Sequence, residues 1–123
     1  MATYRNFKRP FRLTFNGAPF GYEQLVQLIR TFREAFPDLH LTIEEQMVAS
    51  HHVITRGTFR GTHHGAWFGV APTGKRVTWP AIAIDRIAQG KVVEMWHVAD
   101  VLGVLHQLGT VPSDLVIQEE DAG

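Results

Sequence analysis

Hydrophobic residues recur at spacings of three and four between Gly21 and Phe36, with polar residues between them. Leu25, Leu28 and Phe32 fall on one face of such a pattern. The period predicts an amphipathic helix over 21–36. Pro37 ends it, because proline disfavours helical geometry in the preceding residue and has no backbone donor of its own.

From Leu39 onward the period falls to two, which is typical of strands. Strands are predicted over 39–48, 53–62, 75–88 and 91–99. The Gln89-Gly90 turn should join the last two as a hairpin. A second, short helix is predicted over 100–108, ended by Gly109. Helices that are segregated from a run of strands indicate an α+β fold with an antiparallel sheet, and a curved sheet around a helix encloses a pocket.

Length and composition favour one globular domain over 1–123, with an atypical N-terminal segment at 1–20 and a flexible tail at 118–123. Hydrophobic residues make up 45%, and acidic and basic residues cancel, which argues against a disordered chain and against a nucleic-acid binder. The absence of cysteine excludes a disulfide framework, a thiolate nucleophile and a cysteine-ligated metal. No apolar run is long enough to span a membrane, and no signal-type apolar core is present, so we expect a cytoplasmic protein.

Seven histidines invite a metal-site hypothesis, which the spacing does not favour. His51-His52 and His63-His64 are adjacent pairs, and neighbouring side chains on a strand point to opposite faces. Each pair can therefore lend one member to a site, and no helix has the His-Glu-x-x-His pattern. We therefore expect no protein-bound metal.

Two carboxylates stand out from those of the solvated surface. Asp85 lies within an otherwise apolar stretch, and Asp100 closes the strand over 91–99. By strand parity Asp100 shares a face with Trp96 and Val98. A poorly hydrated wall there would raise the pKa of Asp100 and suit it to general acid/base work. Position alone favours the other interpretation, in which Asp100 is the N-cap of the final helix.

The three tryptophans can be read in two ways. Trp67, Trp79 and Trp96 are either core residues or the lining of a pocket for aromatic compounds. Their concentration in one half of a small chain makes a partly aromatic cavity credible.

Several short motifs occur in a fixed order along the C-terminal two thirds. They are Gly61-Thr62-His63-His64-Gly65, Pro72-Thr73-Gly74, Arg86-Ile87, Gly90-Lys91-Val92-Val93-Glu94-Met95-Trp96, Asp100 and Gln107-Leu108-Gly109. Ala-Phe-Pro-Asp-Leu at 35–39 extends the set. Together they resemble the SnoaL-like polyketide cyclases, also called ester cyclases.

This resemblance implies a cone-shaped, nuclear-transport-factor-two-like (cystatin-like) fold and a homodimer or higher homo-oligomer. It also implies cofactor-independent, intramolecular aldol-type ring closure of a hydrophobic polyketide ester, with one aspartate as general acid/base. That aspartate falls on Asp100. Trp96 would form pocket wall, and four further residues would line the pocket or donate hydrogen bonds: His63, Trp79, Arg86 and His97. Parity sets His97 opposite Asp100, so a bulge would be needed to bring both inward.

Relatives in this family usually carry helices before the first strand that cover the mouth of the cone, and this sequence is expected to lack them. Family membership does not fix a substrate, because one fold hosts many functions. Alternative functions are a non-catalytic module that binds a small hydrophobic molecule or mediates dimerisation, and an isomerase, dehydratase or epoxide hydrolase on the same fold.

Overall fold

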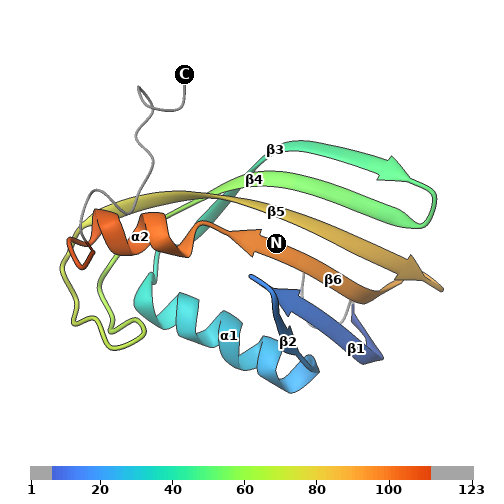
Figure 1. Cartoon of the computed structure of the whole chain (residues 1–123), viewed down its shortest axis with the longest axis horizontal. Coiled ribbons are helices and arrows are strands. Elements are labelled where there is room, and N and C mark those ends of the chain that lie inside the picture. Colours follow the sequence, from blue (N-terminus) through green and yellow to red (C-terminus); the bar gives the residue numbers. More distant parts are fainter. Residues whose placement is uncertain (1–6, 112–123) are drawn as a thin grey trace.

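A computed structural model describes residues 7–111 (Figure 1). In chain order its elements are β1 (Phe7–Phe15), β2 (Ala18–Phe20), α1 (Tyr22–Ala35), β3 (His40–Ala49), β4 (His52–Thr62), β5 (Arg76–Ala88), β6 (Lys91–Ala99) and α2 (Val101–Gln107). The helix over 21–36, the four strands after it and the closing helix therefore stand within about one or two residues of their predicted bounds.

The six strands form one curved sheet in the order β2-β1-β6-β5-β4-β3. All neighbouring pairs are antiparallel except β1 and β6, which run parallel. The sheet arches over α1, and α2 lies beside β5 at the end of β6 (Figure 1). The predicted α+β cone is thus confirmed, as an open sheet with helices on its concave side.

The strands β1 and β2 were not predicted from the sequence pattern. They occupy the segment that we had set apart as atypical, and β1 supplies the parallel neighbour of β6. Pro10 lies within β1, in the stretch where its pairing with β6 shifts register between Phe7 and Arg12. Proline cannot donate to a ladder, so a short local pattern containing it does not look like a strand. The predicted flexible tail at 118–123 lies outside the described residues.

Two apolar clusters hold the ends of α1 against the sheet. One gathers Phe36, Trp67, Trp79 and Val104 near the C-terminal end of α1, and its members are almost completely buried. The other gathers Phe11, Leu13, Leu25 and Val92 near the N-terminal end. The middle of α1 is left facing the concave side of the sheet between the two clusters.

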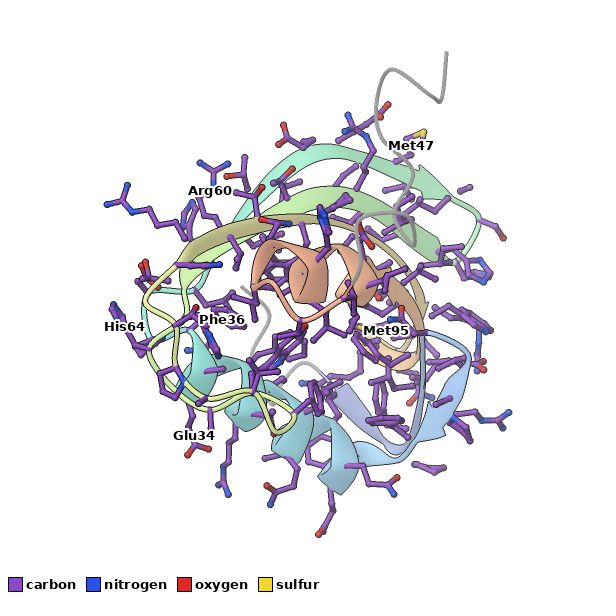
Figure 2. The ribbon with its side chains drawn as sticks, turned by 60° about the vertical axis from the view of Figure 1, so that its left-hand side comes forward. Glu34, Phe36, Met47, Arg60, His64 and Met95 are labelled. Atoms are coloured by element: carbon purple, nitrogen blue, oxygen red, sulfur yellow. The ribbon has the colours of Figure 1, made fainter. Side chains whose placement is uncertain are left out.

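The backbone of the loop after β4 lies very close to the backbone at the C-terminal end of α1. The backbone N–H groups of His64 and Gly65 both donate to the carbonyl oxygen of Ala35, at 3.0 and 3.1 Å. A Cβ atom on Gly65 would lie 2.1 Å from the carbonyl oxygen of Glu34. Only glycine allows this approach of two backbones. In Figure 2, Phe36 points inward beside this crossing, whereas Glu34 and His64 point outward.

Candidate functional site

A cavity of about 270 Å³ lies between the concave face of the sheet and α1. Most of its wall is apolar, and four polar side chains interrupt it. The apolar lining comes from α1 (Leu25, Leu28, Ile29, Phe32), β1 (Leu13, Phe15), the residue before β3 (Leu39), β3 itself (Leu41, Ile43), and β4 to β6 (Phe59, Trp79, Ala83, Met95, Ala99). The polar side chains are Gln46, Thr55, Asp85 and His97. In Figure 2, Met95 points into this interior.

Four aromatic side chains make up much of the wall. Phe59 and Trp79, on adjacent strands, stack with their ring centroids 5.4 Å apart and their planes 17° apart. Phe32 packs against Trp79 from α1, at 5.9 Å, and Phe15 contacts Phe32 at 6.3 Å. Such a surface suits a flat, apolar ring system, because aromatic faces pack by offset stacking or edge to face. The predicted aromatic cavity therefore exists, and Trp79 is its tryptophan.

Asp85 is the acidic residue of the cavity. It lies on the inner face of β5 between Ala83 and Ile87, and its Oδ1 is buried with no hydrogen-bond partner among the residues of the described range 7–111. Burial raises the pKa of Asp85 from 3.8 to about 6. A carboxyl group with that pKa can take up and release a proton near neutral pH.

His97 reaches the same cavity from β6. It packs against the rings of Phe15 and Phe59, with centroids 5.3 and 6.2 Å away. Burial lowers its pKa from 6.5 to about 4, so the imidazole is neutral at pH 7. Asp85 pairs with Met95 across the two strands, and His97 is therefore its diagonal neighbour on the same face. A neutral imidazole has one ring N–H to donate and one nitrogen to accept.

Asp100, the aspartate expected to be catalytic, does not line the cavity. It is exposed at the N-terminus of α2, where its carboxylate Oδ1 accepts a hydrogen bond of 2.9 Å from the backbone N–H of Gly103. The expected poorly hydrated wall around Asp100 is wrong, because the face of β6 that carries it points outward: Val98 on that face is 63% exposed. The geometry gives Asp100 the capping role that its position also allowed.

Among the other expected site residues, the structure brings His97 and Trp79 together and places three elsewhere. Trp96 lies on the outer face of β6 and is 38% exposed. Arg86 forms an ion pair with Glu94, at 3.4 Å, away from the cavity lining. His63 is completely buried beside Phe36 and holds the following loop, because its Nδ1 accepts from the backbone N–H of Thr73 at 3.1 Å.

Strand parity correctly predicted that His97 and Asp100 lie on opposite faces of the sheet. No bulge interrupts β6 between them; the irregularity in its pairing with β5 lies earlier, near Arg86 and Ile87. The residue missing from the expected site is Asp85, and its signal was visible as a single acid in a run of apolar residues. Gln46 and Thr55 had no comparable signal.

A family model described as SnoaL-like polyketide cyclase matches residues 5–108. The chain belongs to this family. Among solved structures, AclR from Streptomyces galilaeus, a proposed hydroxylase, is 32% identical over 88% of this chain and 81% of its own, with a TM-score of 0.83. A proposed SnoaL-like polyketide cyclase from Jannaschia sp. CCS1 is 28% identical over 89% and 78%, with a TM-score of 0.81. IdmH from Streptomyces antibioticus, a proposed polyketide cyclase, is 25% identical over 85% and 83%, with a TM-score of 0.76.

The reactions proposed for AclR and IdmH differ, so similarity to these structures does not fix the chemistry of this chain. No curated protein was found to match the chain. Within residues 7–111, no three histidine, aspartate or glutamate side chains lie close enough together to hold a metal ion. In the same range, no helix has the length and apolar character needed to cross a membrane.

Proposed function

We propose that this SnoaL-like protein is a cofactor-independent enzyme that enolises a hydrophobic carbonyl ester and closes a ring by an intramolecular aldol-type reaction, with Asp85 as its single acid/base. One observation carries the proposal: Asp85 is the one carboxylate that lines the apolar cavity in the described part of the chain, and its Oδ1 is buried there with no partner. A buried carboxylate without a partner lowers the stability of the folded protein, so its presence in a cavity points to a functional role.

The reaction balances with protein groups alone. Ionised Asp85 takes a proton from the carbon next to a carbonyl group, which becomes an enolate. The enolate carbon attacks a second carbonyl of the same molecule, so that a carbon–carbon bond forms and the attacked oxygen becomes an alkoxide. The proton held by Asp85 then passes to that alkoxide, which restores the carboxylate. The neutral ring N–H of His97 donates a hydrogen bond to the enolate oxygen, where negative charge develops.

Deuterium exchange tests the first step without the natural substrate. The two-ring ketone 2-tetralone carries exchangeable protons next to its carbonyl, and ¹H NMR in D₂O follows their loss. We expect the protein to exchange them faster than buffer alone, and Asp85→Asn to lower that rate at least a hundredfold, within the range typical of a general base. Asp100→Asn is the matched control, because asparagine also caps a helix well.

The outcomes separate the candidates. Exchange that survives in Asp85→Asn and is lost in Asp100→Asn would return the acid/base role to Asp100. Binding of 2-tetralone without any exchange would favour a non-catalytic module for small hydrophobic molecules. For the wild-type protein, the rate should rise with pH through about 6 as Asp85 ionises and then level off.

We further propose that the protein is a homodimer joined through the outer face of the sheet. Apolar side chains there stand in register across the strands: Met47 opposite Ile54, Ile54 opposite Ile84, Ile84 opposite Trp96 and Ile82 opposite Val98. Ile82 and Val98 are 50% and 63% exposed. Contiguous exposed apolar surface of this kind is typical of a protein–protein interface, and a second copy offers a matching face.

Light scattering after size-exclusion chromatography measures the oligomeric state. Val98→Lys sets a charge in the middle of this face and should yield a monomer. Val48→Lys is the control, because Val48 is more exposed, at 76%, and lies at the tip of the β3–β4 hairpin. A wild-type protein that is monomeric at micromolar concentration would contradict this proposal.

A further inference from the structure

The strand β3 contains a bulge that decides which of its side chains enter the cavity. Ile43 pairs with Gly57 and Glu45 pairs with Arg56, so Glu44 is an extra residue without a partner on β4. One extra residue reverses the alternation of side chains beyond it. Ile43 lines the cavity before the bulge, and Gln46, rather than Glu45, lines it afterwards.

The two acids at the bulge are held on the outer side. The Glu44 Oε1 accepts a hydrogen bond of 3.0 Å from the hydroxyl of Thr58, and Glu45 pairs with Arg56 at 3.4 Å. A strand of regular pairing would instead turn Glu45 inward, next to an apolar wall and a second carboxylate. The bulge therefore exchanges an acid for an uncharged amide at this position of the cavity.

That amide orients a hydroxyl group. The Nε2 of Gln46 donates to the Oγ1 of Thr55, directly opposite on β4, at 3.0 Å. A hydroxyl group carries one proton as well as its lone pairs, so Thr55 can accept from Gln46 and still donate. Among residues 7–111 no acceptor receives that proton. The Gln46–Thr55 pair thus presents a donor at the cavity wall.

The pair lies one strand away from Asp85 and two strands away from His97. On the inner face Thr55 stands opposite Ala83, and Ala83 stands opposite His97. Since neighbouring strands are about 4.8 Å apart, Thr55 and His97 are separated by roughly 10 Å along the sheet. The methyl group of Ala83 leaves the space between them open. Asp85 lies one inward position further along β5, so it is the diagonal neighbour of Thr55, at about 7–8 Å.

We propose that Gln46 and Thr55 form a second polar subsite, which binds an oxygen substituent at the end of the substrate remote from the carbonyl group that is enolised. The inference rests on the proposed function for the other end of the molecule. A cavity of about 150 Å³ with apolar walls is enough to hold benzene. The 270 Å³ here therefore suits about two fused rings. The substrate class is a carbonyl ester of about this size that is enolisable at one end, has a second carbonyl group for ring closure and carries a hydroxyl group at its far end.

Isothermal titration calorimetry with two probes tests this assignment. The probes are 2-tetralone and 6-hydroxy-2-tetralone, which differ by one hydroxyl group on the ring remote from the carbonyl. We expect the wild-type protein to bind the hydroxylated probe about tenfold more tightly, as one well-formed hydrogen bond allows. Thr55→Val and Gln46→Leu should each reduce this affinity ratio to near one.

Thr58→Val is the matched control, because Thr58 belongs to the same strand but directs its hydroxyl to Glu44 on the outer side. It should keep the tenfold preference. Loss of the preference in Thr58→Val, its retention in Thr55→Val, its absence in the wild-type protein, or no measurable binding of either probe would overturn the subsite. The exchange assay with Asp85→Asn measures proton transfer, whereas the affinity ratio of the two probes measures binding at the subsite. A failure of the proposed proton transfer can therefore be distinguished from a failure of the subsite.

Discussion

Replacing Asp85 with asparagine is expected to stabilise the protein above pH 6. The variant keeps the shape of the side chain but removes a charge that the cavity solvates poorly. The rise of the Asp85 pKa from 3.8 to about 6 corresponds to about 3 kcal/mol, at 1.36 kcal/mol for each pH unit. Because the residue is only half-buried, water screens part of this cost, and we expect about 1–2 kcal/mol.

The sign follows from proton linkage. The folded protein holds the Asp85 proton more tightly than the unfolded chain does, so this group favours folding below pH 3.8. That contribution falls as the pH rises from 3.8 to about 6 and is absent above it. The advantage of Asp85→Asn over the wild-type protein should therefore be small at pH 4 and full at pH 8.

Urea denaturation at pH 4, 6 and 8 measures the difference, and thermal melting at pH 8 should show a rise of roughly 4–8 °C. Asp100→Asn serves as control and should change stability little at any of these pH values, since its side chain is exposed and asparagine caps as well as aspartate. A wild-type protein as stable as Asp85→Asn at pH 8, or a difference independent of pH, would refute the claim that Asp85 is ionised in a poorly hydrated cavity.

His97 should affect stability in the opposite direction, because its pKa is about 4 in the folded protein and 6.5 in the unfolded chain. The free energy of unfolding should therefore decrease as the pH falls from 6.5 to 4. The ring signals of His97 in NMR should not shift between pH 8 and pH 5.5. Gly65→Ala should lose about 2–3 kcal/mol in urea denaturation, because the new methyl group meets the backbone of Glu34. Gly21→Ala is the control, because its Cβ would approach Gln24 Oε1 no closer than 3.6 Å, and its free energy of unfolding should fall by less than about 1 kcal/mol. An equal decrease in the two variants would argue against the backbone contact at Gly65. Asp100→Ala should lose about 1 kcal/mol with the loss of its cap on α2 and leave binding of 2-tetralone intact, which calorimetry can check.

Local periodicity was sufficient for the central elements of the fold. The repeat of three and four gave α1, and alternation gave β3 to β6. In α1, β5 and β6 that period matches a buried face, whereas β3 is exposed from Ile43 to Ala49. The same reasoning failed for β1, where Pro10 breaks the pattern and the partner is a parallel strand about 80 residues later in the chain. Pairing of that kind depends on the assembled sheet rather than on neighbouring residues.

The site was predicted only in part for a related reason. Parity divides β6 into two sets, one with Trp96, Val98 and Asp100 and the other with Met95, His97 and Ala99, and both sets are largely apolar. Nothing local says which set faces the cavity. The structure decides it, and the decision moves the acidic residue of the cavity from Asp100 to Asp85.

The unpaired Glu44 has a consequence for how this strand can change over evolutionary time. Deletion of that single codon would remove the bulge and leave Ile43 and Gln46 facing inward, because the pairs on both sides of Glu44 already follow the alternation of β4. The strand would lose its local bend and the hydrogen bond between Glu44 and Thr58. Glu44 is therefore a position at which related proteins can gain or lose a residue while the lining of the cavity stays the same.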